Sequence, residues 1–492
     1  MPGVTEVPIG AFDISRFREP LGARYDELQP AIEHARELMA GRVVWHVNST
    51  AAGGGVAEML ATLLAYTRGA GVDVRWLVIS GDSEFFEITK RIHNNLHGSE
   101  GDGGPLGETE RRHYERVASE NAAALTPLVR PQDIVYLHDP QPAGLTPLLR
   151  ETGAHLVWRC HVGLDTPNEC ARRAWSFLLP YVEPADHYVF SREAFAWEGL
   201  DRSRTWTVHP SIDPFSPKNQ ELEPAAVEAI LGRTGIVEDG GSVASFRRQD
   251  GSPGRVDRPA EMIQDAPLRP DDELVTKVSR WDRLKDPVGV MQGFAEHCAD
   301  REAHLLLAGP ATGGVADDPE AADVLTAVTE LRKELGPDVR HRVHLACLPM
   351  DDLEENAATV NAIQRHATVV VQKSLAEGFG LTVAEAMWKE RAVVSTRVGG
   401  IQEQIDHGTS GLLIDDASDL RSFGRAVSSL LGDRTTRERM GRAARERVRD
   451  QFLVTRHLLQ YADLLSGVLG DRQSEDASAP ASTADEGPSR TS

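Results

Sequence analysis

The 492-residue chain has little cysteine, no long apolar run and fewer basic than acidic residues. Its cysteines, Cys160, Cys170, Cys298 and Cys347, form no Cys-x-x-Cys pair, which argues against a zinc site or a disulfide framework and favours reduced, buried thiols. No stretch approaches the roughly 18 to 20 apolar residues that span a bilayer, and the first residues lack the features of a secretory signal. The sequence therefore predicts a protein of the cytoplasm.

The shortage of positive charge limits the partners of this protein. The formal net charge of −22 repels nucleic-acid backbones and anionic lipid surfaces, so neither nucleic acid nor a membrane is an expected partner. An acidic protein that handles a diphosphate must gather a few cations in one cleft. We expect small-molecule substrates, and the sequence leaves the oligomeric state open, with a homodimer as one option.

The length and the alternation of elements indicate the fold class. A chain of this size is too long for one ordinary core, so two large α/β domains are expected. Short apolar, β-rich runs alternate with helix-like segments, which is typical of doubly wound parallel sheets. The first series of predicted strands covers residues 42–47, 72–79, 133–139, 155–161 and 187–191. The second series covers residues 273–280, 304–309, 342–348, 367–372, 391–396 and 411–414. We predict two Rossmann-like domains facing across a cleft, with ligands at the carboxyl ends of the strands.

The boundary between the domains falls near HPSIDPFSPKN, where prolines and polar residues interrupt both series. We predict a first domain over 1–215, with an appended amphipathic helix at 24–40, and a second domain over 216–450.

Three further segments have distinct compositions. Residues 238–272 are rich in Gly, Asp, Arg and Pro and are predicted to form a poorly ordered surface insertion. A helix over 451–470 is predicted to cross back to the first domain. The polar tail over 471–492 is predicted to be disordered.

The segment AEGFGLTVAEAMWKE carries the strongest signal for a binding site. Gly378 and Gly380 let backbone N–H groups approach a ligand, and the positive end of the helix that follows suits a diphosphate or sugar hydroxyls. Glu377 precedes this helix and Glu385 lies just inside it, so they can bind different parts of one elongated ligand. The alternative is a helix N-terminus whose acidic residues only complement the helix dipole.

This pattern resembles the donor-site signature of the family-four retaining glycosyltransferases, which have the GT-B fold. The shared features are Glu-Gly-Phe-Gly-Leu, a second glutamate eight positions after the first, and then Gly399-Gly400 and Glu403. The resemblance implies that Glu377 binds hydroxyls of the donor sugar and that Glu385 binds the nucleotide ribose. It also implies that the sugar and diphosphate meet backbone amides of Gly378, Phe379, Gly380 and Leu381.

Two cations follow another predicted strand, in KVSRWDRLKDP. Arg280 lies at the strand end and Lys285 lies five residues later in a loop. A guanidinium and an ammonium that converge on a leaving diphosphate would stabilise its developing charge. The alternative is a solvated basic turn, but the spacing resembles the Arg-x4-Lys diphosphate clamp of the same family.

No Asp-x-Asp occurs in the chain, so the metal-binding motif of the other major transferase fold is absent. No residue stands out as a covalent nucleophile. The resemblance implies no essential metal and no cofactor beyond the sugar-nucleotide substrate.

The first domain offers its own candidates. In HVNSTAAGGGVAEML, the run Gly53–Gly55 between a strand and a helix fits close approach to the donor, with Gly54 and Gly55 as donor-binding residues; a tight turn without a ligand is the alternative. This run is neither a P-loop nor a dinucleotide fingerprint. Asp139 and His161 each end a predicted strand. Asp139 is predicted to orient acceptor hydroxyls, and His161 to bond the donor sugar or support an oxocarbenium-like centre.

Several first-domain strings are similar to those of the trehalose glycosyltransferring synthases, over roughly residues 20–470. They are HVNSTAAGGGVAEML, SGDSEFFEITKRIHNNLHG, HDPQPAGL, WRCHVGLDTPN and PSIDPFSPKN. The resemblance implies reversible formation of α,α-trehalose from a nucleotide-activated glucose, ADP- or UDP-linked, and free glucose. Lys90 and Asn94 would then reach the acceptor, although a helix that only packs near the cleft is the alternative.

Two other functions stay open at this point. Retaining trehalose phosphorylases share much of the pattern but use inorganic phosphate, for which a ribose-binding Glu385 has less purpose. A non-catalytic protein that binds sugar nucleotides is the third option.

Overall fold

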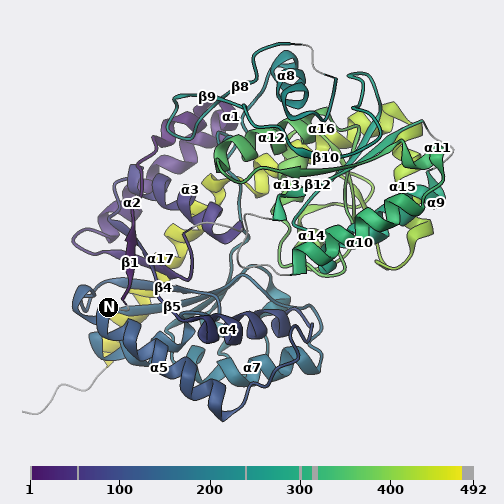
Figure 1. The fold of residues 1–492 in the computed structure, drawn as a ribbon. Coiled ribbons are helices and arrows are strands. Elements are labelled where there is room, and N and C mark those ends of the chain that lie inside the picture. The colour runs from purple at the N-terminus through teal and green to yellow at the C-terminus, as the bar shows by residue number, and fades with distance from the viewer. Residues whose placement is uncertain (1–2, 52–54, 239–240, 299–301, 313–319, 479–492) are drawn as a thin grey trace, which may run out of the picture.

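The computed structural model describes residues 3–51, 55–238, 241–298, 302–312 and 320–478, with side chains described up to residue 470. Within these ranges the strands form two seven-stranded sheets, one in each half of the chain, and a separate two-stranded sheet. Helices cover both large sheets, so the molecule has two α/β lobes (Figure 1). The predicted fold class is therefore confirmed.

The first sheet has the strand order β1-β3-β2-β4-β5-β6-β7. Its strands are β1 (Thr5–Val7), β2 (Val44–Asn48), β3 (Val74–Val78), β4 (Ile134–His138), β5 (His155–Cys160), β6 (His187–Phe190) and β7 (Thr205–Thr207). All neighbours are parallel except β1, which pairs antiparallel with β3 at the edge. Every residue of β2, β4, β5 and β6 is buried, as expected of a parallel sheet with helices on both faces.

The second sheet has the order β10-β13-β12-β11-β14-β15-β16. Its strands are β10 (Glu261–Ile263), β11 (Leu274–Val278), β12 (His304–Pro310), β13 (Val343–Leu348), β14 (Val369–Gln372), β15 (Ala392–Thr396) and β16 (Leu412–Ile414). Only β10 runs antiparallel to its neighbour. The eleven strands predicted from apolar runs all form. The strands that were missed in the two large sheets, β1, β7 and β10, are three-residue edge strands without such a run.

The helices of the first half of the sequence are α1 (Arg18–Leu21), α2 (Leu28–Leu38), α3 (Gly55–Gly69), α4 (Ser83–Leu96), α5 (Glu108–Leu125), α6 (Thr146–Leu149), α7 (Glu169–Val182) and α8 (Pro224–Thr234), of which α8 packs on α12 in the second lobe. Those of the second half are α9 (Pro287–His297), α10 (Glu320–Glu334), α11 (Pro337–Arg340), α12 (Leu353–His366), α13 (Leu381–Trp388), α14 (Ile401–Gln404), α15 (Leu420–Gly432), α16 (Arg434–Gln451) and α17 (Val454–Ser478). Many starts are capped by an acidic or amide side chain, such as Asp82 before α4 and Asp352 before α12.

Successive residues of each buried strand belong to cores on opposite faces of the first sheet. In β4, Val135 and Leu137 pack in the core under α4, α5 and α7, whereas Ile134 and Tyr136 pack in the core under α2, α3 and α17. This two-residue alternation fixes which way each strand end presents its side chains.

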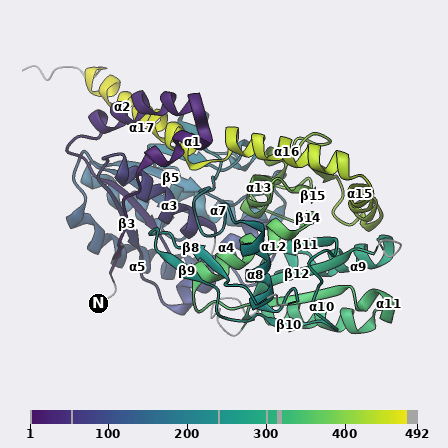
Figure 2. The ribbon, with the colours of Figure 1, turned by 90° about the horizontal axis from the view of Figure 1, so that it is seen from above.

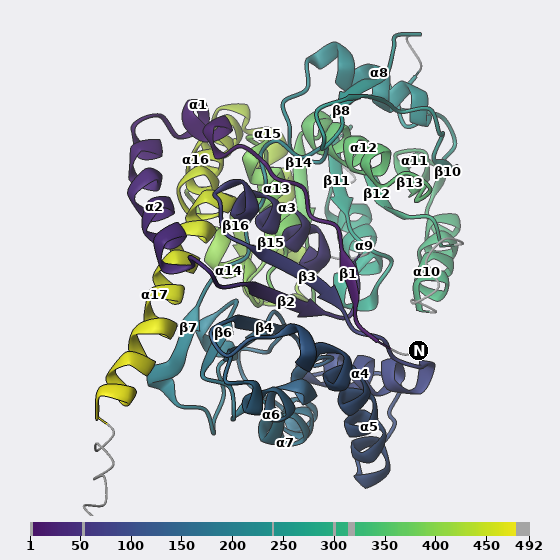
Figure 3. The ribbon, with the colours of Figure 1, turned by 90° about the vertical axis from the view of Figure 1, so that its left-hand side faces the viewer.

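The last helix links the two lobes. Figure 2 shows α16 and α17 following one another along one side of the molecule towards α2, and Figure 3 shows α17 beside α2. Leu464 and Val468 of α17 are buried in the same core as Tyr66 of α3. The helix continues to Ser478, so the first part of the tail predicted to be disordered is helical; the rest of that tail lies outside the described residues.

The segment 238–272 is not the poorly ordered surface insertion that its composition predicts. It supplies the hairpin of β8 (Ser245–Arg247) and β9 (Pro253–Arg255) and the edge strand β10. Phe246, Val256 and Leu268 are buried in one core with residues of α8 and α12. The prediction failed because these apolar residues are isolated in the sequence and gather only in the fold.

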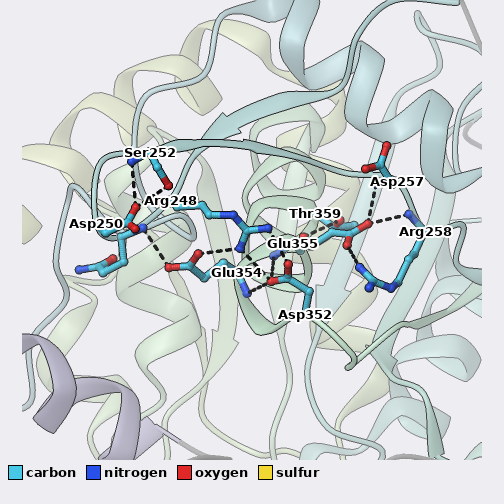
Figure 4. A network of polar contacts seen from close by, with 10 residues as sticks. Arg248, Asp250, Ser252, Asp257, Arg258, Asp352, Glu354, Glu355 and Thr359 are labelled. Carbon is cyan, nitrogen blue, oxygen red and sulfur yellow. Dashed lines mark hydrogen bonds and ion pairs between the residues drawn. The ribbon is translucent and has the colours of Figure 1, made fainter. Parts of the chain in front are cut away.

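The polar residues of this segment are paired rather than solvated. Arg248 donates to Asp352 and Glu354 at the start of α12, and the backbone N–H groups of Asp257 and Arg258 each lie 2.6 Å from Glu355 Oε1 (Figure 4). The acidic first turn of α12 therefore holds the segment against the second lobe.

Three of the four cysteines are buried, as the sequence predicts, and Cys170 is half-buried. All four lie among the described residues and form no disulfide. No helix among the described residues is long and apolar enough to cross a membrane.

Candidate active site

The order of strands reverses once in each large sheet. In the first sheet, β2 and β4 are neighbours at the centre; β3 continues the sheet beyond β2, and β5 to β7 continue it beyond β4. In the second sheet, β11 and β14 are the corresponding central pair. Ligands of doubly wound sheets bind beside such a reversal, at the carboxyl ends of the strands. Among the described residues, the segments that follow these four strands carry Gly55, Asp139, the pair Arg280 and Lys285, and Glu377. The topology thus places most of the predicted site residues at the two reversal points.

Lys285 and Glu377 form an ion pair. Lys285 ends the short 3-10 helix Arg283–Lys285, and its Nζ lies 2.6 Å from Glu377 Oε1. The hydroxyl of Ser374 donates to Glu377 Oε2 at 3.3 Å. Burial alone would raise the pKa of Glu377, but the ammonium of Lys285 outweighs it and holds the pKa below its ordinary value. Glu377 is therefore a carboxylate that accepts hydrogen bonds, and this suits a sugar ligand better than a proton donor.

A second glycine turn holds the Glu377 turn in place. Gly399 has φ of 48°, and a Cβ there would lie 1.8 Å from the carbonyl oxygen of Glu377. The backbone N–H of Gly400 donates to the carbonyl of Gly378 at 2.8 Å. Gly380, at φ of 79°, caps α13, which begins at Leu381. Glycine is required at 399 because any side chain would push the turn that carries Glu377 out of place.

Glu385 lies inside α13 and is buried. Lys218 Nζ lies 3.8 Å from Glu385 Oε1 and also 2.6 Å from Glu58 of α3, so this carboxylate sits where the two lobes meet. Glu385 Oε2 is buried and has no hydrogen-bond partner among the described residues. A buried, unpaired carboxylate oxygen is costly, and a ligand hydroxyl would satisfy it.

The two lobes touch at the Glu377 turn. A Cβ on Gly378 would lie 3.0 Å from the carbonyl oxygen of His161, and one on Gly55 would lie 3.6 Å from Leu381 Cδ1. Gly55 therefore faces the start of α13, whereas Gly54 lies outside the described residues. The turn that carries Glu377 therefore packs directly against the first lobe.

His161 and Asp139 are joined by a hydrogen bond. The backbone N–H of His161 donates to Asp139 Oδ1 at 2.7 Å, and Asp139 has the left-handed φ of 66°. Asp139 is half-buried as a residue, and burial of its carboxyl group raises its pKa to about 7. The strand ends of β4 and β5 are thereby locked together.

Burial fixes the charge of the His161 ring, and Arg159 fixes which ring nitrogen carries the proton. Burial lowers the pKa of His161 well below its ordinary value, so the ring is neutral. Arg159 Nε donates to His161 Nε2 at 3.1 Å. Because a guanidinium has no acceptor, Nε2 accepts and the ring proton lies on Nδ1. His138 Nδ1 lies 3.2 Å from the same Nε2, which extends the network into the core.

The remaining predicted residues are less closely held. Arg280 is half-exposed, and its Nη2 lies 3.3 Å from Asp282 Oδ2. Lys90 is exposed on α4, and Asn94 packs on the loop at Gly101, whose added Cβ would meet Asn94 Nδ2 at 2.8 Å. Among the described residues, no hydrogen bond joins Lys90 or Asn94 to Glu377 or Lys285.

The sequence reasoning missed three residues near the site: His93, His97 and Lys277. His97 is close enough to Lys285 and Glu377 for both charges to act on its pKa. The i, i+4 spacing of the two histidines on the predicted helix was a usable signal. Lys277 is a buried lysine within β11, and its Nζ has no hydrogen-bond partner among the described residues. A lysine inside an apolar strand was the signal there.

In the part of the chain that the structure describes, no group of three or more His, Cys, Asp or Glu side chains is arranged to hold a metal ion.

Each lobe matches a known protein family. Residues 46–197 match the family model for the trehalose synthase N-terminal domain, and residues 260–447 match that for glycosyl transferases group 1. A UDP-forming α,α-trehalose-phosphate synthase from Burkholderia xenovorans has a similar structure, with a TM-score of 0.64, 15% identity and coverage of 87% of this chain and 99% of that chain. The fold and the second-lobe match together define a glycosyltransferase of the GT-B type.

Two curated relatives narrow this class. The trehalose synthase of Thermococcus litoralis is 35% identical over 453 residues, covering 92% of this chain and 96% of that protein. A trehalose phosphorylase of Grifola frondosa is 26% identical over 486 residues, covering 89% of this chain but 59% of that protein. The chain belongs to the trehalose synthase family of glycosyltransferases.

Proposed function

We propose that this protein transfers glucose reversibly between a nucleoside diphosphate and free glucose, giving α,α-trehalose with retention of the anomeric configuration. The observation that carries the proposal is the pair Lys285–Glu377 at the reversal point of the second sheet. The 35% sequence identity to a trehalose synthase, which extends over nearly the whole length of both proteins, supports the choice of product.

The donor would lie along the Glu377 turn and α13. Glu377 would accept hydrogen bonds from the glucosyl hydroxyls, and backbone amides from Gly378 to Leu381 would meet the sugar and diphosphate. The unpaired Oε2 of Glu385 would accept from a ribose hydroxyl. Because bare phosphate has no ribose, this oxygen favours a nucleotide donor over phosphorolysis.

Catalysis would be electrostatic. As the bond between the glucosyl C1 and the diphosphate oxygen breaks, Lys285 and Arg280 would stabilise the charge on the leaving phosphate. The acceptor hydroxyl would form the new bond to C1 from the same face and pass its proton to the leaving phosphate oxygen. No residue then needs to act as a covalent nucleophile, and no metal is required for this charge balance.

The first lobe would complete the site. The N–H at His161 Nδ1 is free of the Arg159 contact, which is made at Nε2, and would donate to a hydroxyl of the donor glucose. Asp139 would orient the acceptor.

One assay tests the proposal. The protein is supplied with trehalose and ADP, UDP or phosphate, and the products are separated; the synthesis direction is run with and without a chelator. Nucleotide glucose plus glucose, formed without added metal, is the expected result. Glucose 1-phosphate formed only with phosphate would instead establish a phosphorylase, and binding of sugar nucleotide without turnover would establish a non-catalytic protein.

A further inference from the structure

Two histidines at the end of α4 lie beside the proposed site and have no role so far. His93 and His97 are one helical turn apart, both are half-buried, and their ring centroids are 4.9 Å apart in an edge-to-face arrangement. They belong to the first lobe, whereas the donor-binding turn belongs to the second. In Figure 1, α4 lies on the side of the first lobe that faces the second.

His97 faces the turn that carries Glu377. A Cβ built on Gly378 would lie 3.7 Å from His97 Cε1, so the edge of the ring is close to that backbone. The charges of Lys285 and Glu377 both act on the ring, as do those of Asp282 and Arg280. His93 packs against His97, and the charges of Lys90 and Arg280 act on its ring. His97 thus borders the Lys285–Glu377 pair from the opposite lobe, with His93 beside it.

Both rings leave a polar atom without a partner. Nδ1 of His93 and Nδ1 of His97 are buried and make no hydrogen bond to the described residues. Buried polar atoms are nearly always paired, so an unpaired one calls for an explanation. A substrate hydroxyl that completes the hydrogen bond would supply it. Two such atoms on adjacent turns of one helix would bind neighbouring hydroxyls of a single sugar ring.

The two rings are uncharged. Burial, assisted by the ammonium of Lys285, lowers the pKa of His97 to about 4, and burial together with His97 lowers the pKa of His93 well below its ordinary value. A neutral imidazole donates through one nitrogen and accepts through the other, which matches a hydroxyl group.

We propose that His97, with His93 beside it, binds hydroxyl groups of the acceptor sugar. The inference rests on the proposed function. The assignment to the acceptor follows from position: the Glu377 turn and α13 of the second lobe supply most groups of the donor site, and His97 approaches that turn from the first lobe, which also carries Asp139, the other residue assigned to the acceptor.

The side chain of His97 can be changed without removing the end of α4. His97 is the C-cap residue, and the hydrogen bonds that close the helix come from its backbone N–H to Asn94, Asn95 and His93. Any residue except proline keeps these bonds. Loss of acceptor binding on substitution therefore reports on the ring and not on the fold of the helix.

The test compares His97→Ala, His97→Gln and His93→Ala with the wild type, and uses the exposed His341 of the second lobe in His341→Ala as the matched control. Initial rates of trehalose formation are measured first with glucose varied at saturating nucleotide glucose, and then with nucleotide glucose varied at saturating glucose. We expect KM for glucose to rise about tenfold or more in His97→Ala, as for the loss of one or two hydrogen bonds, with KM for the donor changed less than about twofold. His97→Gln, which still donates and accepts, should keep more of the affinity than His97→Ala.

Two results separate failure of this inference from failure of the proposed function. If the wild type makes trehalose while His97→Ala keeps its KM for glucose, or changes KM only for the donor, the inference alone is overturned. If the wild type makes no trehalose from nucleotide glucose and glucose, the proposed function and the inference fall together. Melting temperatures within about 2 °C of the wild type show that the variants are folded.

Discussion

Lys285 Nζ and Glu377 Oε1 lie 2.6 Å apart, although 92 positions separate the two residues in the sequence. The loop after β11 supplies the lysine and the loop after β14 supplies the glutamate, and these strands are neighbours only in the fold. The pair puts one positive and one negative charge where a leaving phosphate and a sugar would meet.

Replacing Lys285 with alanine should lower kcat by about 10² or more, because the ammonium would no longer stabilise charge that develops on the leaving phosphate. Rates under substrate saturation check this. Lys333→Ala is the control, since Lys333 is exposed on α10 and its Nζ pairs with Glu330 at 2.8 Å. An unchanged kcat in a folded Lys285→Ala protein would remove this residue from the mechanism.

Glu385→Gln should raise KM for the nucleotide sugar by about tenfold or more, with less effect on KM for glucose. Glutamine has no negative charge, and in one of the two orientations of its amide an NH2 group takes the place of the unpaired Oε2. A charge-assisted hydrogen bond from the ribose would therefore be lost. Competition by free nucleoside diphosphate provides a second measurement. Glu446→Gln, an exposed change in α16, should leave both constants unaltered; equal effects of the two substitutions would argue against a ribose contact.

Gly399→Ala and Gly408→Ala form a matched pair. Both glycines have positive φ, 48° and 83°, so each alanine carries a similar backbone strain of about 1–2 kcal/mol. Only at Gly399 would the new Cβ collide, at 1.8 Å, with the carbonyl of Glu377, whereas nothing lies within 4 Å at Gly408. We expect Gly399→Ala to abolish most activity and Gly408→Ala to reduce only thermal stability. Similar activity in the two variants would show that the Glu377 turn tolerates displacement.

Lys277→Met should stabilise the fold at neutral pH and change its pH dependence. Burial, with help from the nearby ammonium of Lys285, lowers the pKa of Lys277 to about 7, below its unfolded value. Between about pH 7 and 10.5 the unfolded chain then binds a proton that the folded chain does not, so stability due to this group rises with pH and is lost as pH falls towards 7.

The methionine variant lacks this titration. The gap in unfolding free energy between variant and wild type should therefore be largest near pH 7, on the order of a few kcal/mol, and shrink towards pH 10. Denaturant unfolding at a series of pH values measures it. A gap that does not depend on pH would show that Lys277 keeps its ordinary pKa in the fold.

Some candidate site residues could be picked out from the sequence because their signals are local. Glu377, Glu385 and their glycines lie within nine residues, and Arg280 and Lys285 lie within six, so composition and spacing alone mark them. Lys90 and Asn94 were chosen from α4, but it is His97, at the end of that helix, on whose pKa the charges of Lys285 and Glu377 act. Which face of α4 meets the second lobe depends on packing between lobes, and no pattern within the helix states it.

The segment 238–272 shows the same limit from another side. Its polar composition predicted a loose insertion, yet its charges pair with the first turn of α12, about a hundred residues further on.

The sequence by itself determined the α/β class, the two series of strands and the glycine-rich turns, because these depend on periodicity and on backbone conformations that only particular residues adopt. The tertiary structure alone decided which strands became neighbours, and so which loops met at the reversal points. It also decided the ionic state of the site: the pairing of Glu377 with Lys285, the neutral rings of His97 and His161, and the unpaired Oε2 of Glu385 all result from burial and from charges brought together from distant parts of the chain.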